Sequence, residues 1–373
     1  MSSLYLSTFA PTLGSGRALR TYTCVKALAS LEPVVFLHVP HGGDRPAPEY
    51  EAIEGLELRS VSPSRGFKRA AFYARKRASG VPDAFARGAH PELLDETLSL
   101  LERDGHERIV AGDLNAAALL LPLASRYPIT YNAHNVMGVY EAANGRRRPL
   151  VQAGVRAFER RLLGCAAESW MVSRLDLDTA RSLVPSARLR YVPNVADVAA
   201  IEPVGAHPRG GGPLMVGDFL YEPNRAGRDF LLGEIMPRVW LQAPETRLTL
   251  VGRGLDGWRA EDSRVEVRGF VEDISAVYAR ADCVVVPLTA GGGTPLKFVE
   301  ALAYRLPVVA TPFAARGLDA RPGEHYREGA DAESFAEGML DVLRDGAPEM
   351  AARGRALAEH EYSVEALSGL IAA

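Results

Sequence analysis

Two patterns of apolar and polar positions, one typical of strands and one typical of helices, alternate along the whole chain. Short continuous apolar runs bounded by polar residues or glycines predict buried strands. In the first half of the chain such runs occupy residues 3–9, 33–39, 56–61, 107–113, 129–134, 168–173 and 189–194. Between them lie longer stretches with one apolar helical face, for example residues 16–29 and 146–163. Strands that alternate with helices indicate a parallel sheet with helices on both faces.

The second half of the chain repeats this alternation. Strands are predicted at residues 213–219, 247–252, 265–270, 283–288 and 307–311, and helices at residues 224–242, 274–280 and 295–304. The intervening stretch "VADVAAIEPVGAHPRGGGP" is rich in proline and glycine, which is typical of a linker. We therefore expect two doubly wound α/β domains. The expected parts are an N-terminal domain at 1–197, a linker at 198–212, a C-terminal domain at 213–355, and a helix at 356–373 that packs back on the first domain.

Composition narrows the function classes. The chain has 373 residues, 47% of them apolar and 24% charged, which is the balance of a globular protein. The net charge of −3 provides no basic field that would recruit nucleic acid. The three cysteines are far apart and form no disulfide or metal-binding pattern, and the N-terminus does not resemble a signal peptide. No apolar run is long enough to span a bilayer. We therefore expect a cytoplasmic protein.

A glycine-rich loop, "AGGGTPLKFVEAL" at residues 290–302, lies between two predicted strands. Gly293 and its two preceding glycines permit positive φ and close approach of a ligand to the backbone. Thr294 can cap the following helix, and Pro295 suits its first turn. The amides of Thr294, Leu296 and Lys297 would then favour an anion such as a phosphate.

Two charged side chains follow in the same helix. Lys297 could add a positive charge beside a phosphate, and Glu300, one turn further on, could accept hydrogen bonds from the diol of a ribose. A phosphate next to a ribose indicates a nucleotide. The alternative is an ordinary strand-to-helix turn whose charged residues are only solvated.

The first predicted strand also leads into a glycine loop, "PTLGSGRALRTY". A dinucleotide fingerprint would require a third glycine where Leu19 stands, and no acidic residue ends the second strand. An NAD site is therefore not expected, and no Walker lysine is present to form a P-loop. We expect instead that Gly16 presents its N–H group to a phosphate or sugar.

Polar residues follow two further strands of the first half. His134 and Asn135 lie at the end of the run at 129–134, where they could bind a polar substrate, or His134 could simply hold its own loop. Asp113 and Asn115 occupy the equivalent place at the end of the run at 107–113. They are candidates for acceptor binding or, alternatively, for capping the next helix.

Three stretches resemble the GT-B glycosyltransferases of family 4. They begin at "YNAHNV", "MVGDFLYEPNRAGRDF" and "GFVEDISAVYARADCVVVPLTAGGGTPLKFVEALAYRLPVVAT", and the last is the most specific. The resemblance extends over almost the whole chain. It implies two Rossmann-like domains that face each other across a cleft, with a nucleotide-sugar donor bound mainly by the second. It also implies a retaining transferase that needs no cofactor.

The resemblance implies roles for individual residues. In the family, the glutamate that matches Glu300 binds the ribose, and the residues that match Thr294, Pro295 and Leu296 hold the diphosphate through backbone amides. The glycine that matches Gly16 contacts the donor phosphate. The histidine that matches His134 contacts the transferred sugar.

The chain departs from the family pattern at several positions. Gly292 stands where the family usually has a first glutamate, and Asp218 stands where many members have an arginine. Arg225 and Arg228, a helical turn further, could supply the missing charge, or they could face solvent. The usual glycine before "PVVA" is replaced by Arg305 and Leu306, which costs little if that turn is not left-handed.

These residues predict a mechanism. Helix amides and Lys297 would stabilise the charge of the departing diphosphate without a metal, since no Asp-x-Asp motif stands in a metal-holding position. Without the first glutamate, we expect the acceptor hydroxyl to attack from the face that the diphosphate leaves. We take His134 and Lys297 as the catalytic residues.

The acceptor is the least defined part. Residues 64–77 form a basic amphipathic stretch that could contact an anionic membrane, cover a soluble acceptor or simply face solvent. A small natural product or a glycan are both compatible acceptors. Two other functions stay open: a sugar-nucleotide epimerase on the same scaffold, and a non-catalytic transferase-like partner subunit. The sequence leaves the oligomeric state undetermined.

Overall fold

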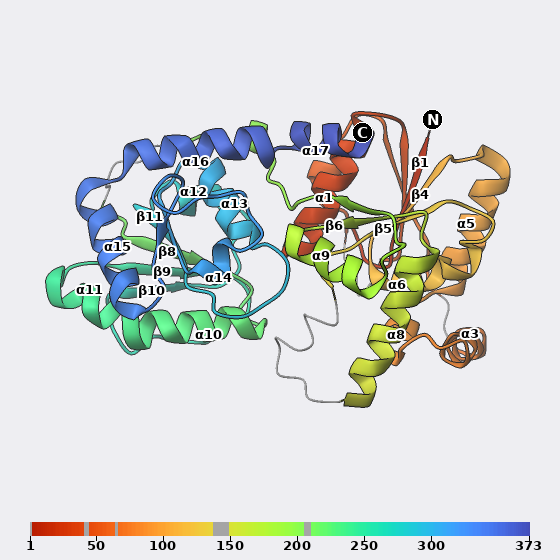
Figure 1. Ribbon diagram of the computed structural model, residues 1–373, viewed down its shortest axis with the longest axis horizontal. Coiled ribbons are helices and arrows are strands. Elements are labelled where there is room, and N and C mark those ends of the chain that lie inside the picture. Colours follow the sequence, from red (N-terminus) through yellow and green to blue (C-terminus); the bar gives the residue numbers. More distant parts are fainter. Residues whose placement is uncertain (1, 41–44, 64–65, 137–148, 205–209) are drawn as a thin grey trace. The chain divides into compact units, whose positions relative to one another are not determined.

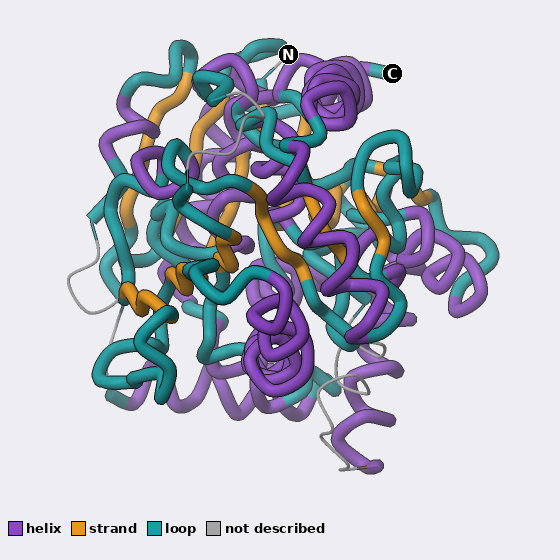
Figure 2. Tube along the Cα trace, turned by 90° about the vertical axis from the view of Figure 1, so that its left-hand side faces the viewer, coloured by secondary structure: helices purple, strands orange, loops and turns teal. Residues whose placement is uncertain are grey.

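The computed structural model describes residues 2–40, 45–63, 66–136, 149–204 and 210–373 (Figure 1). The predicted linker at 198–212 and the basic stretch at 64–77 therefore lie partly outside the described residues. The chain divides into two compact units. The first comprises residues 1–193 and 367–373, and the second comprises residues 194–366. Each unit is an α/β structure, and the alternation of strand, loop and helix can be followed along the trace in Figure 2.

The first unit contains a sheet of seven parallel strands in the order β3-β2-β1-β4-β5-β6-β7. The strands are β1 (Ser3–Ser7), β2 (Val34–His38), β3 (Leu56–Ser60), β4 (Arg108–Ala111), β5 (Ile129–Asn132), β6 (Glu168–Met171) and β7 (Leu189–Tyr191). Five of them consist mainly of buried residues, and only the two edge strands are half exposed. This burial on both faces explains why they appear in the sequence as continuous apolar runs.

Helices pack around this sheet. They are α1 (Gly16–Ala29), α2 (Pro48–Glu51), α3 (Phe67–Ala78), α4 (Asp83–Gly88), α5 (Pro91–Asp104), α6 (Leu114–Leu120), α8 (Pro149–Cys165) and α9 (Arg174–Leu183), with a 3₁₀ turn, η1 (Leu121–Leu123). The last helix, α17 (Val364–Ala372), ends in this unit. There Arg190 donates to the carbonyl of Leu370 at 2.8 Å, and the hydroxyl groups of Ser30 and Ser368 are 2.9 Å apart.

The second unit contains a sheet of six parallel strands in the order β10-β9-β8-β11-β12-β13. The strands are β8 (Pro213–Val216), β9 (Leu248–Val251), β10 (Val265–Arg268), β11 (Cys283–Val286), β12 (Val308–Ala310) and β13 (Arg327–Glu328). The central β11 is completely buried, whereas both residues of β13 are exposed. The edge strand β13 therefore carries no apolar signal in the sequence.

The helices of the second unit cover both faces of its sheet (Figure 1). On one face lie α10 (Glu222–Phe230), the π-helical η3 (Leu231–Ile235), α11 (Met236–Gln242) and α15 (Ala332–Asp345). On the other lie α12 (Ser275–Tyr278), α13 (Leu296–Ala303) and α16 (Pro348–Glu361). Two short helices, η2 (Val198–Ala200) and α14 (Pro312–Ala315), complete the unit. The helix expected at 224–242 widens at η3 because Pro237 follows and cannot donate to the preceding turn.

Both strand orders reverse direction next to the first strand of each sheet. In the first unit the reversal lies between β1 and β4, and in the second between β8 and β11. Loops that leave the carboxyl ends of such neighbouring strands diverge and leave room for a ligand. The glycine-rich loop after β11 and the glycine loop after β1 therefore each occupy the favoured ligand position of their own unit.

The turn after α13 does not meet the condition under which the loss of its glycine would cost little. Arg305 has φ of 58°, so this turn is left-handed although no glycine stands there. The chain must reverse within the four residues between α13 and β12, and a left-handed residue closes the helix end most directly. The replacement of glycine at this position therefore carries a conformational cost.

Within the described ranges, no helix is both long and apolar enough to cross a membrane.

Candidate functional site

The loop between β11 and α13 has the backbone that its glycines predict. Gly291 has φ of 134° and Gly293 has φ of 68°, both in the region that disfavours residues with a Cβ. A Cβ added to Gly291 would lie 3.2 Å from the hydroxyl of Tyr221. The expectation of positive φ is thus confirmed at two of the three glycines, and Gly292 is exposed with an ordinary φ.

Helix α13 begins one residue later than predicted and has a different cap. Pro295 is its N-cap and provides no side-chain hydrogen bond. The expected cap, Thr294, is instead bound by the Asn194 side chain, which donates to its carbonyl at 3.0 Å and lies 3.2 Å from its hydroxyl. The N–H groups of Leu296 and Lys297 have no carbonyl to bind within the helix, and no described residue accepts from them. The start of α13 therefore offers free amides to an anion.

Lys297 is buried beneath this helix start, with 9% of its surface exposed. Its ammonium group donates to Asn224 Oδ1 at 2.7 Å, and Asn224 Nδ2 donates to the carbonyl of Asp218 at 2.8 Å. Burial lowers the pKa of Lys297 to about 8, although the nearby Glu300 and Asp218 carboxylates oppose this shift. The lysine is thus held in place by its amide partner while retaining its charge at neutral pH.

Glu300 lies one helical turn beyond Lys297. The hydroxyl of Tyr278, a fully buried residue, donates to Glu300 Oε2 at 3.3 Å. Tyr278 in turn stacks on Tyr304, with ring centroids 4.2 Å apart. Burial raises the pKa of Glu300 to about 7, while the Tyr278 hydrogen bond and the Lys297 charge favour its ionised form. Near neutral pH this carboxyl group can therefore either accept or donate a hydrogen bond.

The loop after β8 contains an ion pair that the sequence does not reveal. Arg253, which follows β9, pairs with the carboxylate of Asp218. The loops after β8 and β9 lie in close contact: a Cβ added at Gly252 would lie 1.7 Å from the carbonyl oxygen of Gly217. Only glycine at position 252 allows this approach, and its φ of 141° is also one that favours glycine.

The two arginines that were expected to supply charge here have other partners. Arg225 donates to the carbonyl groups of Phe219 and Leu220 and pairs with Glu222. Arg228 pairs with Asp229 and lies 4.5 Å from the ring centroid of Trp258. Donor binding by these two arginines stays a prediction, and Arg253 is the arginine that pairs with Asp218. Its position just after a strand that neighbours β8 is the only signal that the sequence provides.

In the first unit, the loop after β1 leads directly into α1. Ser15 caps this helix by accepting from the N–H of Ala18 at 3.2 Å, and Gly16 is its first residue. Neither Gly14 nor Gly16 has a positive φ, so the glycines do not serve a left-handed turn. Gly16 is exposed, and no described residue accepts from its N–H group, which agrees with a ligand-facing amide.

His134 is held by its own unit and is uncharged. Its Nε2 lies 2.7 Å from the carbonyl oxygen of Gly112, which fixes a proton on that nitrogen. Burial, together with the charge of Arg20, lowers the pKa of His134 to about 3. At neutral pH the remaining ring nitrogen, Nδ1, can accept a hydrogen bond but has no proton to donate.

Asp113 has four hydrogen-bond donors within the unit. It caps α6 by accepting from Ala116 N at 2.9 Å, and it accepts from Ser7 Oγ and from both the amide and hydroxyl groups of Thr8. Asn115 also contacts the hydroxyl of Thr8, at 3.2 Å. These contacts favour the capping alternative for Asp113. Acceptor binding by Asn115 and by the partly exposed Asn135 stays a prediction.

Arg20 is a further buried charge that sequence patterns do not identify, with 1% of its surface exposed. It donates to Asn132 Oδ1 at 3.0 Å and to the carbonyl groups of Val192 and Pro193. It thereby fixes the segment after β7 against α1. The sequence does not identify Arg20 as buried, because a single arginine on a helix is usually exposed.

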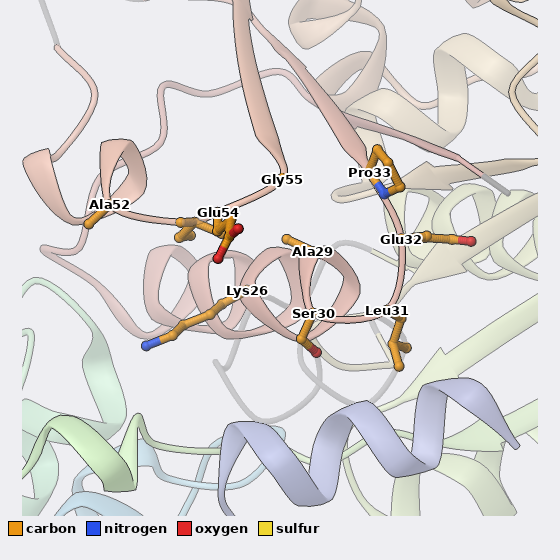
Figure 3. Close-up of a pocket in the computed structure, with 10 residues that line it drawn as sticks. Lys26, Ala29, Ser30, Leu31, Glu32, Pro33, Ala52, Glu54 and Gly55 are labelled. Atoms are coloured by element: carbon orange, nitrogen blue, oxygen red, sulfur yellow. The ribbon is translucent and has the colours of Figure 1, made fainter.

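A separate hollow of about 500 Å³ lies in the first unit, at the amino ends of the strands (Figure 3). It lies between the end of α1 and the turns that precede β2 and β3, and Lys26, Glu32 and Glu54 are among its lining residues. Because these turns are at the amino ends of the strands, the hollow is not part of either loop cluster. Within the described parts of the chain, no three His, Cys, Asp or Glu side chains are grouped so as to hold a metal ion.

Comparisons with known proteins identify a matching family and similar folds. Residues 213–345 match the family model "Glycosyl transferases group 1". No curated protein sequence matches the chain. Among solved structures, sucrose-phosphate synthase from Thermosynechococcus elongatus is similar, with a TM-score of 0.74 at 16% identity, covering 100% of this chain and 97% of that one.

Two further structures share the architecture. HepE from Anabaena, in complex with UDP and glucose, has a TM-score of 0.68 at 15% identity, covering 99% of this chain and 98% of that one. A TarM variant from S. aureus, in complex with ligands that include UDP, has a TM-score of 0.70 at 9% identity, with coverages of 100% and 99%. At such identities the structural likeness shows the fold, and the family match adds the activity class. The chain therefore has the GT-B fold of these structures, and the match of its residues 213–345 to glycosyl transferases group 1 indicates a glycosyltransferase.

Proposed function

We propose that this protein transfers a sugar from a nucleoside diphosphate sugar to a hydroxyl acceptor, with retention of anomeric configuration and without a metal ion. One observation carries the proposal: the free amides of Leu296 and Lys297 open α13, the buried Lys297 ammonium is held by Asn224, and Glu300 follows one turn later. This arrangement matches the two chemically distinct parts of a nucleoside diphosphate.

The diphosphate is assigned to the start of α13. Free amides and the positive end of the helix dipole favour its negative charge, and Lys297 adds a full positive charge. The ribose is assigned to Glu300, whose carboxylate accepts from neighbouring hydroxyl groups. The backbone around Gly291 and Gly293 leaves the space that such a ligand needs, because neither residue has a Cβ.

The transfer step requires no nucleophile from the glycine-rich loop, where Gly292 stands in place of an acidic residue. The bond between the anomeric carbon and the donor phosphate oxygen breaks, and its electron pair stays on the phosphate. The acceptor oxygen bonds to the anomeric carbon on the same face, and its proton passes to a phosphate oxygen. The α13 amides and Lys297 stabilise the charge that grows on the leaving group, which lowers the barrier.

Acceptor binding is assigned to the first unit. Its neutral His134 can accept a hydrogen bond from a sugar hydroxyl through Nδ1, so we assign it a binding role rather than that of a general acid. Gly16 is assigned to a phosphate or sugar oxygen through its free N–H.

A screen of donors tests the proposal. Purified protein is incubated with UDP-glucose, GDP-mannose, ADP-glucose and dTDP-glucose, and release of the nucleoside diphosphate is measured with and without EDTA. UDP-glucose is the first choice, because a HepE structure contains that compound. Release that survives EDTA, together with an α-linked product from an α-linked donor, is the expected result. An inverted product, or a requirement for added metal, would contradict the mechanism.

The same screen separates the two alternative functions. An epimerase would convert the donor into a different nucleotide sugar without releasing nucleoside diphosphate. A non-catalytic partner subunit would bind none of the four donors in a calorimetric titration.

A further inference from the structure

The guanidinium group of Arg253 has hydrogen-bonding capacity that its ion pair does not use. Its Nε atom is buried, and within the described residues it has no hydrogen-bond partner. A guanidinium group with an unsatisfied N–H is costly to keep in place, so its position calls for an explanation. The side chain as a whole is 43% exposed, so a ligand can reach its outer part although it cannot reach Nε.

The position of Arg253 connects it to the donor-binding loops. Val216 and Val251 are paired in the sheet, and Asp218 and Arg253 each lie two residues beyond them. Both side chains therefore leave the carboxyl ends of neighbouring strands. Asp218 is also close enough to Lys297 to influence its pKa, and its carbonyl accepts from Asn224, the residue that holds Lys297.

Charge balance shows why an arginine is needed at this place. A carboxylate beside Lys297 would repel the diphosphate of a donor and offset the ammonium charge. The ion pair with Arg253 cancels the charge of Asp218. An arginine has five donors, so it can hold one carboxylate and still donate to a second anion.

We propose that Arg253 is a second donor-binding cation, which Asp218 positions so that the exposed part of its guanidinium group donates to an oxygen of the donor's diphosphate. The inference rests on the proposed function and adds to it a residue from the loop after β9. Arg225 and Arg228 pair with other groups in the structure, and donor binding by them stays a prediction.

Isothermal titration calorimetry tests the assignment, with the donor among the four above that binds best to the wild-type protein. Arg253→Gln is expected to weaken donor binding about tenfold, the value of one charge-assisted hydrogen bond. Binding of the corresponding nucleoside, which has no phosphate, should not change. The dependence of donor affinity on salt concentration should also become weaker.

Asp218→Asn separates donor binding from a purely structural ion pair. If Arg253 only neutralises Asp218, Arg253→Gln should weaken binding in the wild-type background but not in the Asp218→Asn background, where no carboxylate is left to neutralise. If Arg253 contacts the donor, Arg253→Gln should weaken binding about tenfold in the Asp218→Asn background as well. Arg264→Gln is the matched control, since Arg264 pairs with Asp262 just before β10, at the opposite edge of the same sheet.

The outcomes are distinct. Unchanged donor affinity in Arg253→Gln overturns the inference, while the proposed function stands if Glu300→Ala still loses donor binding. The absence of any effect of Arg253→Gln in the Asp218→Asn background also overturns it. Arg253→Lys keeps the positive charge but loses the planar set of guanidinium donors, so it should bind the donor with intermediate affinity. This variant provides a second test if Arg253→Gln is unstable. A wild-type protein that binds none of the four donors would overturn both proposals.

Discussion

At the scale of single residues, the second unit places two opposite charges one helical turn apart in a poorly solvated site. Lys297 is fixed by Asn224 and Glu300 by Tyr278, so both charged groups have partners before any ligand arrives. Such fixed groups need little reorganisation when a charged ligand binds. Their separate contributions can be tested one at a time.

Glu300→Ala should weaken donor binding by roughly 10- to 100-fold, because it removes charged hydrogen-bond acceptors worth about 1.5–3 kcal/mol. Lys297→Ala should lower kcat by about 100-fold, because the cation acts on the charge that develops as the diphosphate leaves. Donor affinity and single-turnover rates measure the two effects. Glu337→Gln, on the exposed face of α15, is the control and should match the wild-type protein. Wild-type behaviour of both site variants would refute the placement of the site.

Donor affinity should also depend on pH, with a rise at lower pH (the lower limb) and a fall at higher pH (the upper limb). Glu300 must lose its proton to accept from ribose, so affinity should rise as pH increases through about 7. Lys297 must keep its proton, so affinity should fall as pH increases through about 8. A nucleotide sugar is the right ligand for this titration, because its diphosphate stays ionised throughout the range.

Tyr278→Phe distinguishes positioning from simple packing in that titration. The tyrosine hydroxyl lowers the pKa of Glu300, so its removal should shift the lower limb to higher pH without altering the buried ring. An unchanged lower limb in Tyr278→Phe would mean that Glu300 is not the group that titrates.

At the scale of elements, helix ends determine more of this structure than helix interiors do. Helix α13 begins without a side-chain cap and ends in the left-handed Arg305. Helix α6 is capped by Asp113 at its start, and near its end the buried ammonium of Lys76 donates to the carbonyl groups of Ala118 and Leu119 at 2.9 and 3.0 Å. The uncapped start is the one assigned to a ligand, whereas the capped ends are purely structural.

Arg305→Gly should stabilise the second unit by about 1 kcal/mol, because glycine adopts a positive φ without the steric cost that a Cβ imposes. The midpoint of urea denaturation measures the change. Arg316→Gly is the matched control, since Arg316 is also exposed and ends α14 but has φ of −61°. The control should be neutral or destabilised. Destabilisation of Arg305→Gly would show that the arginine side chain itself is required.

The basic helix α3 uses much of its charge within the first unit. Lys68 pairs with Glu92 and Asp95, Arg77 pairs with Asp83, and Lys76 is buried as a helix cap. Phe67, in contrast, is 88% exposed. The predicted membrane contact therefore has fewer free cations than the sequence indicates, and the solvated alternative is favoured.

We accordingly expect weak binding to vesicles that contain 30% phosphatidylserine. Each free cation near the surface should contribute about 1 kcal/mol to the binding free energy. Sedimentation of the protein with these vesicles measures this. Phe67→Ser combined with Arg75→Gln is the comparison variant. Tight binding by the wild-type protein that this variant abolishes would restore the membrane assignment.

At the scale of the whole molecule, the two units share one sheet topology but differ in the chemistry at their carboxyl edges. The second unit has free amides, Lys297, Arg253 and Glu300 there. The first has a neutral histidine and a carboxylate whose oxygens are taken up within the unit. Repeated topology therefore does not mean repeated function, and the donor is assigned to one unit.

A saturating donor should therefore stabilise the second unit selectively. At a donor concentration of 100 times Kd the stabilisation should be about 2.7 kcal/mol. Amide hydrogen exchange should slow in the segments around β11 and α13 and stay unchanged around the amino edge of the first sheet, near Lys26 and Gly55. Protection confined to the first unit would show that the donor site has been assigned to the wrong half of the chain.

The sequence determined the local elements of this protein. Its buried strands are continuous apolar runs because both faces of each sheet are covered, and helix α1 begins and ends where its pattern predicts. The glycine-rich loop was identifiable because positive φ and a missing Cβ leave a direct mark on residue type. The family resemblance rests on these same local features, and the match over residues 213–345 confirms it at the level of glycosyl transferases group 1.

Tertiary structure alone decided the partners of the polar groups. Asn194 binds Thr294, Arg253 binds Asp218, and Asn224 holds Lys297, although each pair is separated by many residues. A hydrogen bond depends on distance and direction in space, and no periodic pattern in a sequence encodes which distant strands end side by side. Arg225 and Arg228 illustrate the difference, since their charge was visible in the sequence but their commitment to other groups was not.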